Sequence, residues 1–204
     1  MSTDKNGNVL LPSDGYKKLK SFKLARLIYD ITVHFVELYI PAKSRTCDQM
    51  VQAARSGVQN IAEGSVIAAT SAKLEINLYN VARGSLEELK LDYQDYLRQN
   101  NEKIWQKNSP LYDEFIRRKI AAAVEFKSFI EWAENIQPQS VNIRKIPYKS
   151  VLVANAVLLL IDTVTYFLKK QMDAKIKTFV ANGGFSENML HARLDNRNNG
   201  GNQR

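Results

Sequence analysis

Hydrophobic side chains recur every three or four residues along most of the chain, which is the spacing that lines one face of an α-helix. In the first long segment they fall at Leu24, Leu27, Ile28, Ile31, Phe35 and Leu38. We predict a helix that begins near Asp14 and ends by Pro41, because a proline disfavours helical geometry in the residue before it.

Capping signals predict two further helices. The second begins at Thr46, with Gln49 three residues later as in a capping box, and stops at Gly64, a residue type that closes helices in the left-handed conformation. Residues 65–70 then form a short connection to a third helix, which Ser71 caps. The predicted inner face of that helix carries Leu74, Leu78, Val81, Ser85, Leu89, Tyr93 and Tyr96.

A fourth helix is predicted after the break at Asn100 and Asn101. Ser109 and Pro110 match the N-cap and first helical residue that often start a helix, and apolar positions continue at helical spacing as far as Ala133. Four antiparallel helices with short links predict an all-α fold, an up-down four-helix bundle over residues 14–137.

The rest of the chain is predicted as a linker over residues 138–149, a C-terminal helical extension or suffix over 150–195, and a disordered tail over 196–204. Residues 1–13 are predicted to be a flexible N-terminus. Residues 151–168 are apolar nearly all round the helix and approach the length of a membrane span, but Asp162 at the centre of a span would cost about 2.5 to 3.5 kcal/mol. Burial between protein surfaces is therefore favoured, and no membrane partner is expected.

Small residues occupy positions where a bundle normally has large ones, namely Ala53, Ala54 and Gly57 in the second helix and Ala82, Gly84 and Ser85 in the third. A glycine inside a helix costs about 0.5 to 1 kcal/mol relative to alanine, so close backbone approach is needed to explain it. Two interpretations stay open: the two helices touch tightly within the chain, or they present flat surfaces to neighbouring subunits.

Composition narrows the class of protein. The chain has 204 residues, 45% of them hydrophobic and 25% charged, with only nine Gly and five Pro. These values exclude a multi-span membrane protein and a turn-rich all-β fold. One cysteine, Cys47, and a polar start at Ser2–Asn8 favour a cytoplasmic location.

The net charge of +8 is concentrated near the C-terminus, because residues 1–138 carry +2 and residues 139–204 carry +6. A basic segment of this kind attracts phosphate polymers, although a tail that only aids solubility would have the same composition. The candidate nucleic-acid-binding residues are Arg55, Arg83, Arg144, Lys145, Lys149, Lys169, Lys170, Lys175 and Lys177. For Arg55 and Arg83, pairing between subunits is an equally good interpretation.

Two motifs point to a family. The run QMVQAARSGVQNIAEG at Gln49–Gly64, followed by VARGSLEEL at Val81–Leu89, resembles the four-helix-bundle family of the 23S rRNA intervening-sequence proteins. That family also contains the accessory variability determinant of diversity-generating retroelements, a partner of reverse transcriptase. The C-terminal FVANGGFSENMLHAR, Phe179–Arg193, resembles the suffix region attached to some of these bundles.

The resemblance implies a non-enzymatic homopentamer with a basic surface that binds RNA or DNA. The matching residues are Asn60 to Gly64 at the predicted end of the second helix, and Gly84, Ser85, Leu86, Glu88 and Leu89 in the third. Many members carry two arginines early in the second helix, where this chain has Val51 and Gln52. Those arginines would be missing here as partners of nucleic acid, and the basic suffix would have to replace them.

Residues near Gly64 have a structural interpretation as well. Asn60 and Glu63 are predicted to lock the turn after the second helix, in preference to direct ligand contact, whereas Gly57, Gly84 and Ser85 are predicted to lie at a close interface.

Catalytic and metal chemistry receives little support. A di-iron bundle needs a Glu-x-x-His pair from each of two helices, but the chain has two histidines in all, His34 and His191. No phosphate-binding glycine loop, dinucleotide fingerprint or nucleophile-base spacing is present. No enzyme activity, cofactor or metal is expected.

The first functional hypothesis is therefore a homo-oligomeric scaffold that binds RNA or DNA, as an accessory to an enzyme such as a reverse transcriptase. The alternative is a protein-interaction module in which the apolar helix at residues 151–168 docks a partner protein or the adjacent subunit. In that case the charge serves only solubility.

Overall fold

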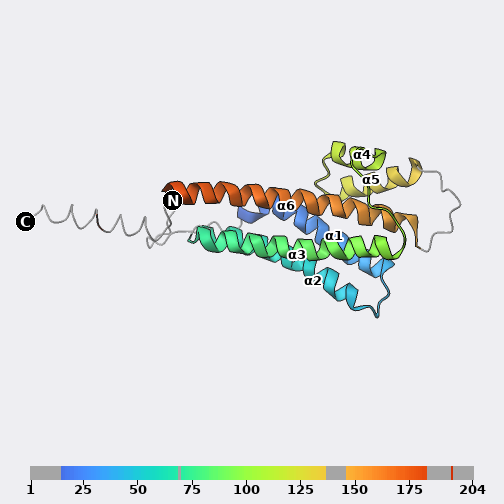
Figure 1. Ribbon diagram of the computed structural model, residues 1–204, viewed down its shortest axis with the longest axis horizontal. Coiled ribbons are helices and arrows are strands. Elements are labelled where there is room, and N and C mark those ends of the chain that lie inside the picture. The colour runs from blue at the N-terminus through green and yellow to red at the C-terminus, as the bar shows by residue number, and fades with distance from the viewer. Residues whose placement is uncertain (1–14, 69, 137–145, 183–193, 195–204) are drawn as a thin grey trace, which may run out of the picture.

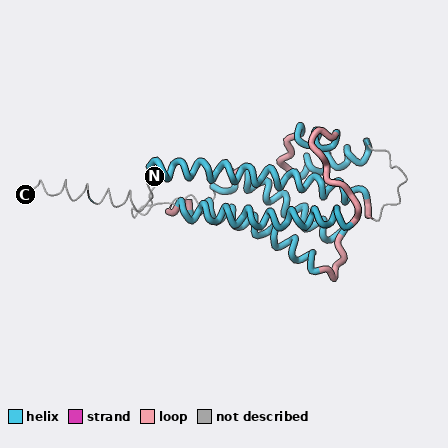
Figure 2. Tube along the Cα trace, viewed as in Figure 1, coloured by secondary structure: helices cyan, strands magenta, loops and turns pink. Residues whose placement is uncertain are grey.

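The computed structural model describes residues 15–68, 70–136, 146–182 and 194, and every regular element in these residues is helical (Figures 1 and 2). The all-α prediction is confirmed. The elements are η1 (Gly15–Lys18), α1 (Lys20–Tyr39), α2 (Arg45–Ile67), α3 (Ala72–Gln99), α4 (Pro110–Arg118), α5 (Ala123–Ile136) and α6 (Tyr148–Asn182). The predicted flexible N-terminus, most of the linker and the predicted tail lie outside the described residues.

The four long helices α1, α2, α3 and α6 pack side by side, so that α6 lies against both α1 and α3 (Figure 1). Helix α6 runs antiparallel to α3, since Tyr96 near the end of α3 bonds to Ser150 near the start of α6 at 2.8 Å. At the other end of α6, Ser21 Oγ at the start of α1 donates to Gln171 Oε1 at 3.0 Å. Helix α6 thus packs between α1 and α3 and contacts both along its length.

The predicted fourth helix is wrong in two respects. Residues 110–136 form two helices rather than one, because Lys119 adopts the left-handed conformation with φ 51° and ends α4. Glu125 then caps α5 by accepting hydrogen bonds from the N–H groups of Ala121 at 2.7 Å and Ala122 at 3.2 Å. Moreover α5 packs on α6 instead of on the first three helices. The place expected for a fourth consecutive helix is taken by the helix expected as a suffix.

Helix α6 is buried through most of its apolar run, which agrees with the expected burial between protein surfaces. Its residues Leu152, Ala156, Val157, Ile161 and Val164 have no measurable exposure. By length and composition alone, residues 148–177 would suffice to cross a membrane, with a mean hydropathy of 2.1 in a window that is 67% buried inside the protein. The cover for this apolar surface comes from the chain's own helices.

Asn155 explains how a polar residue fits on the buried side of α6. It is 1% exposed, and its Oδ1 accepts a hydrogen bond from the backbone N–H of Trp105 at 2.8 Å. Its Nδ2 donates to the carbonyl oxygens of Lys103 at 3.2 Å and Val151 at 3.0 Å. Because every polar atom of the amide has a partner, its burial is tolerated and fixes the connection between α3 and α4 on α6.

Local signals set most helix ends. Helix α1 ends at Tyr39, before Pro41, and Ser71 caps α3 by accepting from the N–H of Leu74 at 3.3 Å, as predicted. The cap of α2 is Ser44 rather than Thr46, because the Ser44 hydroxyl accepts from the Thr46 N–H at 3.2 Å.

Helix α2 does not stop at Gly64 but continues to Ile67. Gly64 is buried inside the helix, where a Cβ would stand 2.8 Å from the Tyr79 ring. The glycine is therefore required for the close approach of α2 and α3, not for helix termination. The connection to α3 is correspondingly shorter than the six residues expected.

The first half of α3 is rotated relative to its predicted inner face. Leu74 and Val81 are 47% and 52% exposed, whereas Glu75, Tyr79 and Ala82 point inward. Further along, Ser85, Leu89, Tyr93 and Tyr96 are buried as predicted. The buried positions 75, 79 and 82 are each one residue after the predicted positions 74, 78 and 81. This register brings Tyr79 into contact with Gly64.

Candidate nucleic-acid interface

Two lysine-rich segments far apart in the sequence lie side by side. Residues 15–29 contain five basic and no acidic side chains, and residues 163–177 contain four basic side chains and one acidic, Asp173. The Ser21–Gln171 hydrogen bond joins the two segments at 3.0 Å. We call their nine basic residues the α1–α6 lysine surface: Lys17, Lys18, Lys20, Lys23, Arg26, Lys169, Lys170, Lys175 and Lys177.

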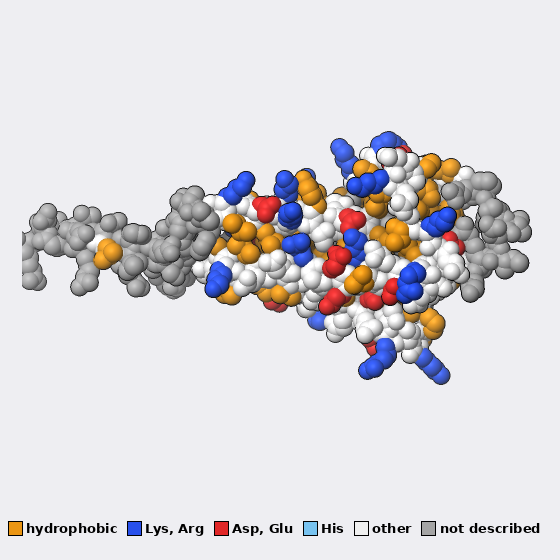
Figure 3. All heavy atoms as spheres, viewed as in Figure 1, with side chains coloured by type: hydrophobic (Ala, Val, Ile, Leu, Met, Phe, Trp, Pro, Cys, Tyr) orange, Lys and Arg blue, Asp and Glu red, His pale blue; other side chains and the backbone are white. Residues whose placement is uncertain are grey.

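Most of these side chains are available to solvent. Lys169, Lys170 and Lys177 are exposed on α6 and form no ion pair with any described residue. The ammonium of Lys170 lies 5.6 Å from the centre of the Tyr166 ring, a cation–π contact that holds the lysine on the surface without neutralising it. In Figure 3, blue Lys and Arg side chains follow α6 toward the end of the chain.

Lys175 has a different role from its neighbours. Its Nζ lies 3.0 Å from Glu75 Oε2, whose side chain is only 4% exposed, while that of Lys175 is 42% exposed. The contact lacks hydrogen-bond geometry, so charge attraction holds it. Burial, reinforced by Glu75, raises the pKa of Tyr79. Lys175 thus compensates a buried carboxylate and is a poor candidate for phosphate contact.

The other predicted basic residues do not join this surface. Lys149 lies near the opposite end of α6, about 30 Å from Lys169 by helical rise, and pairs with Glu134 at 3.1 Å. Arg144 and Lys145 lie outside the described residues. The predicted set is therefore not one contiguous site.

Arg55 on α2 and Arg83 on α3 lie outside the two lysine-rich segments. Arg55 is exposed on α2, and neither arginine forms an ion pair within the described part of the chain. Arg83 is partly buried on α3, and its Nε is shielded from solvent without a hydrogen-bond partner. It precedes Lys90 by seven residues, so both lie on the side of α3 that faces α6.

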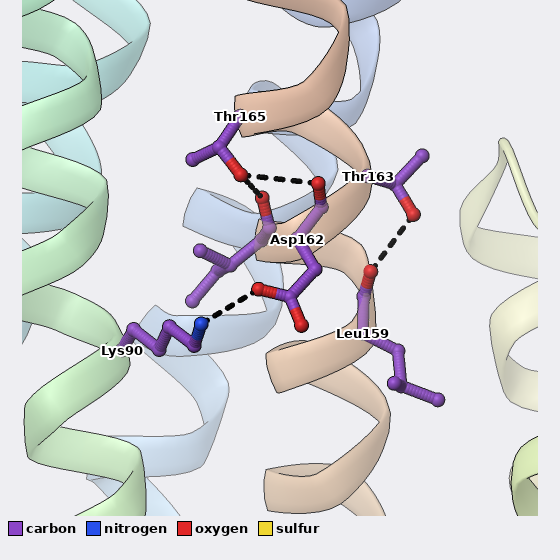
Figure 4. A network of polar contacts seen from close by, with 6 residues as sticks. Lys90, Leu159, Asp162, Thr163 and Thr165 are labelled. Atoms are coloured by element: carbon purple, nitrogen blue, oxygen red, sulfur yellow. Dashed lines mark hydrogen bonds and ion pairs between the residues drawn. The ribbon is translucent and has the colours of Figure 1, made fainter. Parts of the chain in front are cut away.

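A polar network crosses the middle of the α3–α6 contact (Figure 4). Lys90 Nζ donates to Asp162 Oδ1 at 2.7 Å, and this hydrogen bond raises the pKa of Lys90. The hydroxyl groups of Thr163 and Thr165 donate to carbonyl oxygens one turn earlier in α6, at 2.8 Å and 3.0 Å. The polar residues that interrupt the apolar run are thus satisfied within the protein.

The residues expected to lock a turn after α2 instead lie within that helix. The amide of Asn60 donates to the Ser56 carbonyl at 2.9 Å and to its hydroxyl at 3.2 Å, and Ser56 shares a hydrogen bond of 2.8 Å with Ser85. Glu63 is exposed on α2. Because α2 continues past Gly64, the turn-locking prediction is wrong, and Asn60 supports the contact between α2 and α3.

The small residues divide between the two interpretations. A Cβ on Gly57 would stand 3.1 Å from Leu86, and Ala54 and Ala82 have no measurable exposure, so these residues allow close packing within the chain. Gly84 is different, because it is exposed and a Cβ there would meet nothing within 4 Å. Packing among the residues that the structure describes does not explain Gly84.

The α2–α3 side has no comparable excess of cations, since α2 and α3 together carry six basic and seven acidic side chains. A hollow of about 540 Å³ lies beside Ser56 and Ser85, with Glu88 and Asp92 among its lining residues. Burial, then the neighbouring carboxylates Asp95 and Glu88, raise the pKa of Asp92. Since α1 and α6 form the opposite side of the four packed helices, the excess of cations lies on one side of them.

The histidine and cysteine singled out by sequence form local contacts. His34 Nδ1 lies 3.4 Å from Glu37 Oε2 on the exposed side of α1, and Cys47 Sγ donates to the Pro41 carbonyl at 3.5 Å. Within the described ranges, no three potential metal-ligating side chains come together.

Sequence reasoning missed Lys18, Lys20 and Lys23 as candidate contacts. The signal was present, since residues 15–29 have no acidic side chain, but a charge count over the whole of residues 1–138 averaged it away. A charge count along the sequence cannot show that the start of α1 packs beside the last part of α6.

No protein-family model matches the sequence, no curated protein matches it, and no solved structure matches it. The resemblance to the intervening-sequence family therefore stays a prediction.

Proposed function

We propose that this chain is a non-enzymatic, homo-oligomeric scaffold of the cytoplasm that binds RNA or DNA through the α1–α6 lysine surface. The observation that carries the proposal is the side-by-side position of two segments with nine basic residues and one acidic. Arg26 and Lys175 are paired with Asp30 and Glu75, so the exposed lysines are the groups left for phosphate contact. Ammonium groups on flexible stems contact phosphates as point charges and do not read base edges, so binding would depend little on sequence. The resemblance makes a reverse transcriptase the enzyme such a scaffold would assist.

The oligomeric part of the proposal rests on the outer face of α3. Leu74, Val81 and Leu91 are 47%, 52% and 56% exposed there, and a Cβ on Gly84 would meet no atom of the described residues within 4 Å. An exposed glycine in mid-helix costs about 0.5 to 1 kcal/mol relative to alanine. Contact with another copy would cover the apolar side chains and use the glycine, and the resemblance implies five copies.

Light scattering tests the assembly. The full chain should have a mass several times 23.2 kDa, and the variant V81E/L91E should shift toward the monomer because it places two carboxylates on the proposed contact. A monodisperse monomer for the unchanged protein would exclude the oligomeric scaffold.

Nucleic-acid binding is tested with two triple variants of equal charge change. K169Q/K170Q/K177Q removes exposed cations from the lysine surface, whereas K43Q/K103Q/K107Q removes exposed cations from the loops at the other end of the molecule. With single-stranded RNA, the first variant should bind more weakly, and the slope of log K against log salt should fall by about 0.7 for each phosphate that is no longer neutralised. The second should stay close to the unchanged protein.

Equal weakening in both variants would point to net charge rather than a defined surface. If neither RNA nor DNA binds at about 50 mM salt, the nucleic-acid role fails. A protein-interaction role would then be left, but the apolar face of residues 151–168 could not be its docking surface without unfolding, because the chain's own helices cover it.

A further inference from the structure

A pocket of about 570 Å³ lies between the start of α1, the end of α4 and the middle of α6. Its apolar wall is contributed by all three helices and the segment after α4, chiefly by Leu24, Phe115, Ile120, Leu160 and Phe167. The first four of these side chains are at most 5% exposed, so the wall is part of the packed interior. Pockets of this size accept ligands of drug-like size.

The polar lining of the pocket is cationic. Lys20, Lys23 and Lys119 line it, and no Asp or Glu among the described residues does. In the part of the chain that the structure describes, none of these three ammonium groups has an ion-pair partner. Three exposed cations beside an apolar wall, with no compensating carboxylate, favour a ligand that carries negative charge on an apolar body.

The backbone after α4 forms one side of the pocket at a conformational cost. Lys119 adopts φ 51° and ψ 47°, a left-handed conformation that residues other than glycine seldom occupy. This turn buries Ile120, which is 5% exposed, and places Ala121 at the pocket. The left-handed residue that ends α4 therefore also shapes one wall of the pocket.

The one other polar side chain in the lining does not compete with the lysines. Thr163 donates its hydroxyl proton to the Leu159 carbonyl at 2.8 Å, so it offers a ligand only an acceptor. The position of an anionic head group is thus determined by the ammonium groups alone.

We infer that this pocket binds a single-chain amphiphile with one anionic head group, of the fatty-acid class. The hydrocarbon chain lies on the apolar wall, and the carboxylate lies among Lys20, Lys23 and Lys119. A volume of about 570 Å³ lies within the range of pockets that hold small ligands and accommodates one hydrocarbon chain. A nucleic-acid backbone has no hydrocarbon chain, so the inference does not rest on the proposed function.

The experiment uses the full chain and two probes of the same length, dodecanoate below its micellar concentration and dodecanol below its solubility limit. Calorimetry should show one dodecanoate per chain, with dodecanol about tenfold weaker because it lacks the charge. K20Q/K119Q should weaken dodecanoate about tenfold and leave dodecanol unchanged. K43Q/K103Q is the charge-matched control and should bind both probes as the unchanged protein does.

Two neighbouring alanines test the location. Ala121 lines the pocket and Ala122 does not, and both are exposed. A121W should fill the pocket and abolish binding of both probes, whereas A122W should bind normally; circular dichroism would confirm that both variants are folded. Since Lys119 lies outside the α1–α6 lysine surface, K119Q should weaken dodecanoate without weakening RNA.

Three results would overturn the inference: no dodecanoate bound at millimolar concentration, equal affinity for the acid and the alcohol, or unchanged binding by folded A121W. Attachment to vesicles of anionic phospholipid without binding of free dodecanoate would likewise count against it, because it would indicate a membrane surface as the ligand.

Discussion

Replacing Lys175 by methionine should destabilise the protein far more than an ordinary surface substitution. The change removes the cation 3.0 Å from the Glu75 carboxylate, which is 4% exposed, and leaves that carboxylate in the contact between α3 and α6. Methionine keeps most of the apolar stem of the lysine, so the effect reports the charge.

The magnitude follows from distance and exposure. Two unit charges 3.0 Å apart attract by about 5.5 kcal/mol at an effective dielectric constant of about 20. Removing one partner of a fully buried pair costs about 3 to 5 kcal/mol. Because Lys175 is 42% exposed, solvent screens the pair in part and water can reach the vacated position, so we expect about 2 to 3 kcal/mol.

The assay is urea unfolding followed by circular dichroism at pH 7, at two protein concentrations so that any effect of assembly is separated. The matched control is K177M, which removes an exposed cation two residues later and should change the unfolding free energy by less than about 0.5 kcal/mol. The double variant E75Q/K175M should recover at least half of the stability, because it removes the unpaired charge.

If K175M were no more destabilised than K177M, Glu75 would have to be hydrated, and its burial against α6 would be refuted. The single variant E75Q completes the comparison. If the destabilisation of E75Q/K175M equalled the sum of those of E75Q and K175M, the two side chains would not interact. RNA binding gives a second readout, since the salt slope of folded K175M should match that of the unchanged protein when Lys175 makes no phosphate contact.

Three further substitutions test the packing. G64A places a Cβ 2.8 Å from the ring of Tyr79, and unfolding in urea should show a destabilisation of about 1 to 2 kcal/mol, overpacking less the gain in helix propensity. Y93F removes the buried 3.0 Å hydrogen bond to Thr32 at a cost of about 1 kcal/mol. Because burial raises the pKa of Tyr93, that group stabilises the fold fully below about pH 10 and progressively less above it, so the alkaline loss of stability should be shallower in Y93F. N155A leaves buried backbone groups unpaired and should lower the free energy of unfolding by about 2 to 3 kcal/mol, which a lower midpoint of thermal unfolding would show.

Sequence reasoning was most successful where a helix end depends on one or two residues. Pro41 ends α1 by a steric effect on its neighbour, and Ser71 caps α3 with its own hydroxyl. Pro110 starts α4 as expected. These are local interactions, so a short stretch of sequence contains all the information that they need.

Gly64 shows where local reasoning has to fail. A glycine near the end of an apolar run is equally compatible with a helix stop and with close packing, and only the position of the Tyr79 ring distinguishes the two. The same contact turns Glu75 inward, where Lys175 from a helix one hundred residues later compensates it. A carboxylate in the core could not be predicted before that partner was known.

The choice of the helix that packs with α1, α2 and α3 was likewise decided by competition. Residues 123–136 and residues 148–168 are both hydrophobic, and the first directly continues the chain after α4. Helix α6 can be covered on nearly all sides, however, whereas α5 has Val124 77% exposed and Ile136 47% exposed. Burying the more apolar helix removes more hydrocarbon surface from water, so the later helix takes the inner position.

Helix α6 has two roles, and these determine how its function can be tested. Its first half supplies interior side chains such as Leu152 and Ile161, and its second half carries Lys169, Lys170 and Lys177. Truncation after Gln137 would remove both at once and expose the apolar faces of α1 and α3, so a loss of RNA binding would not be separable from a loss of folding. Because the cations point to solvent and the interior does not depend on them, neutralising them in place removes the charge and keeps the fold.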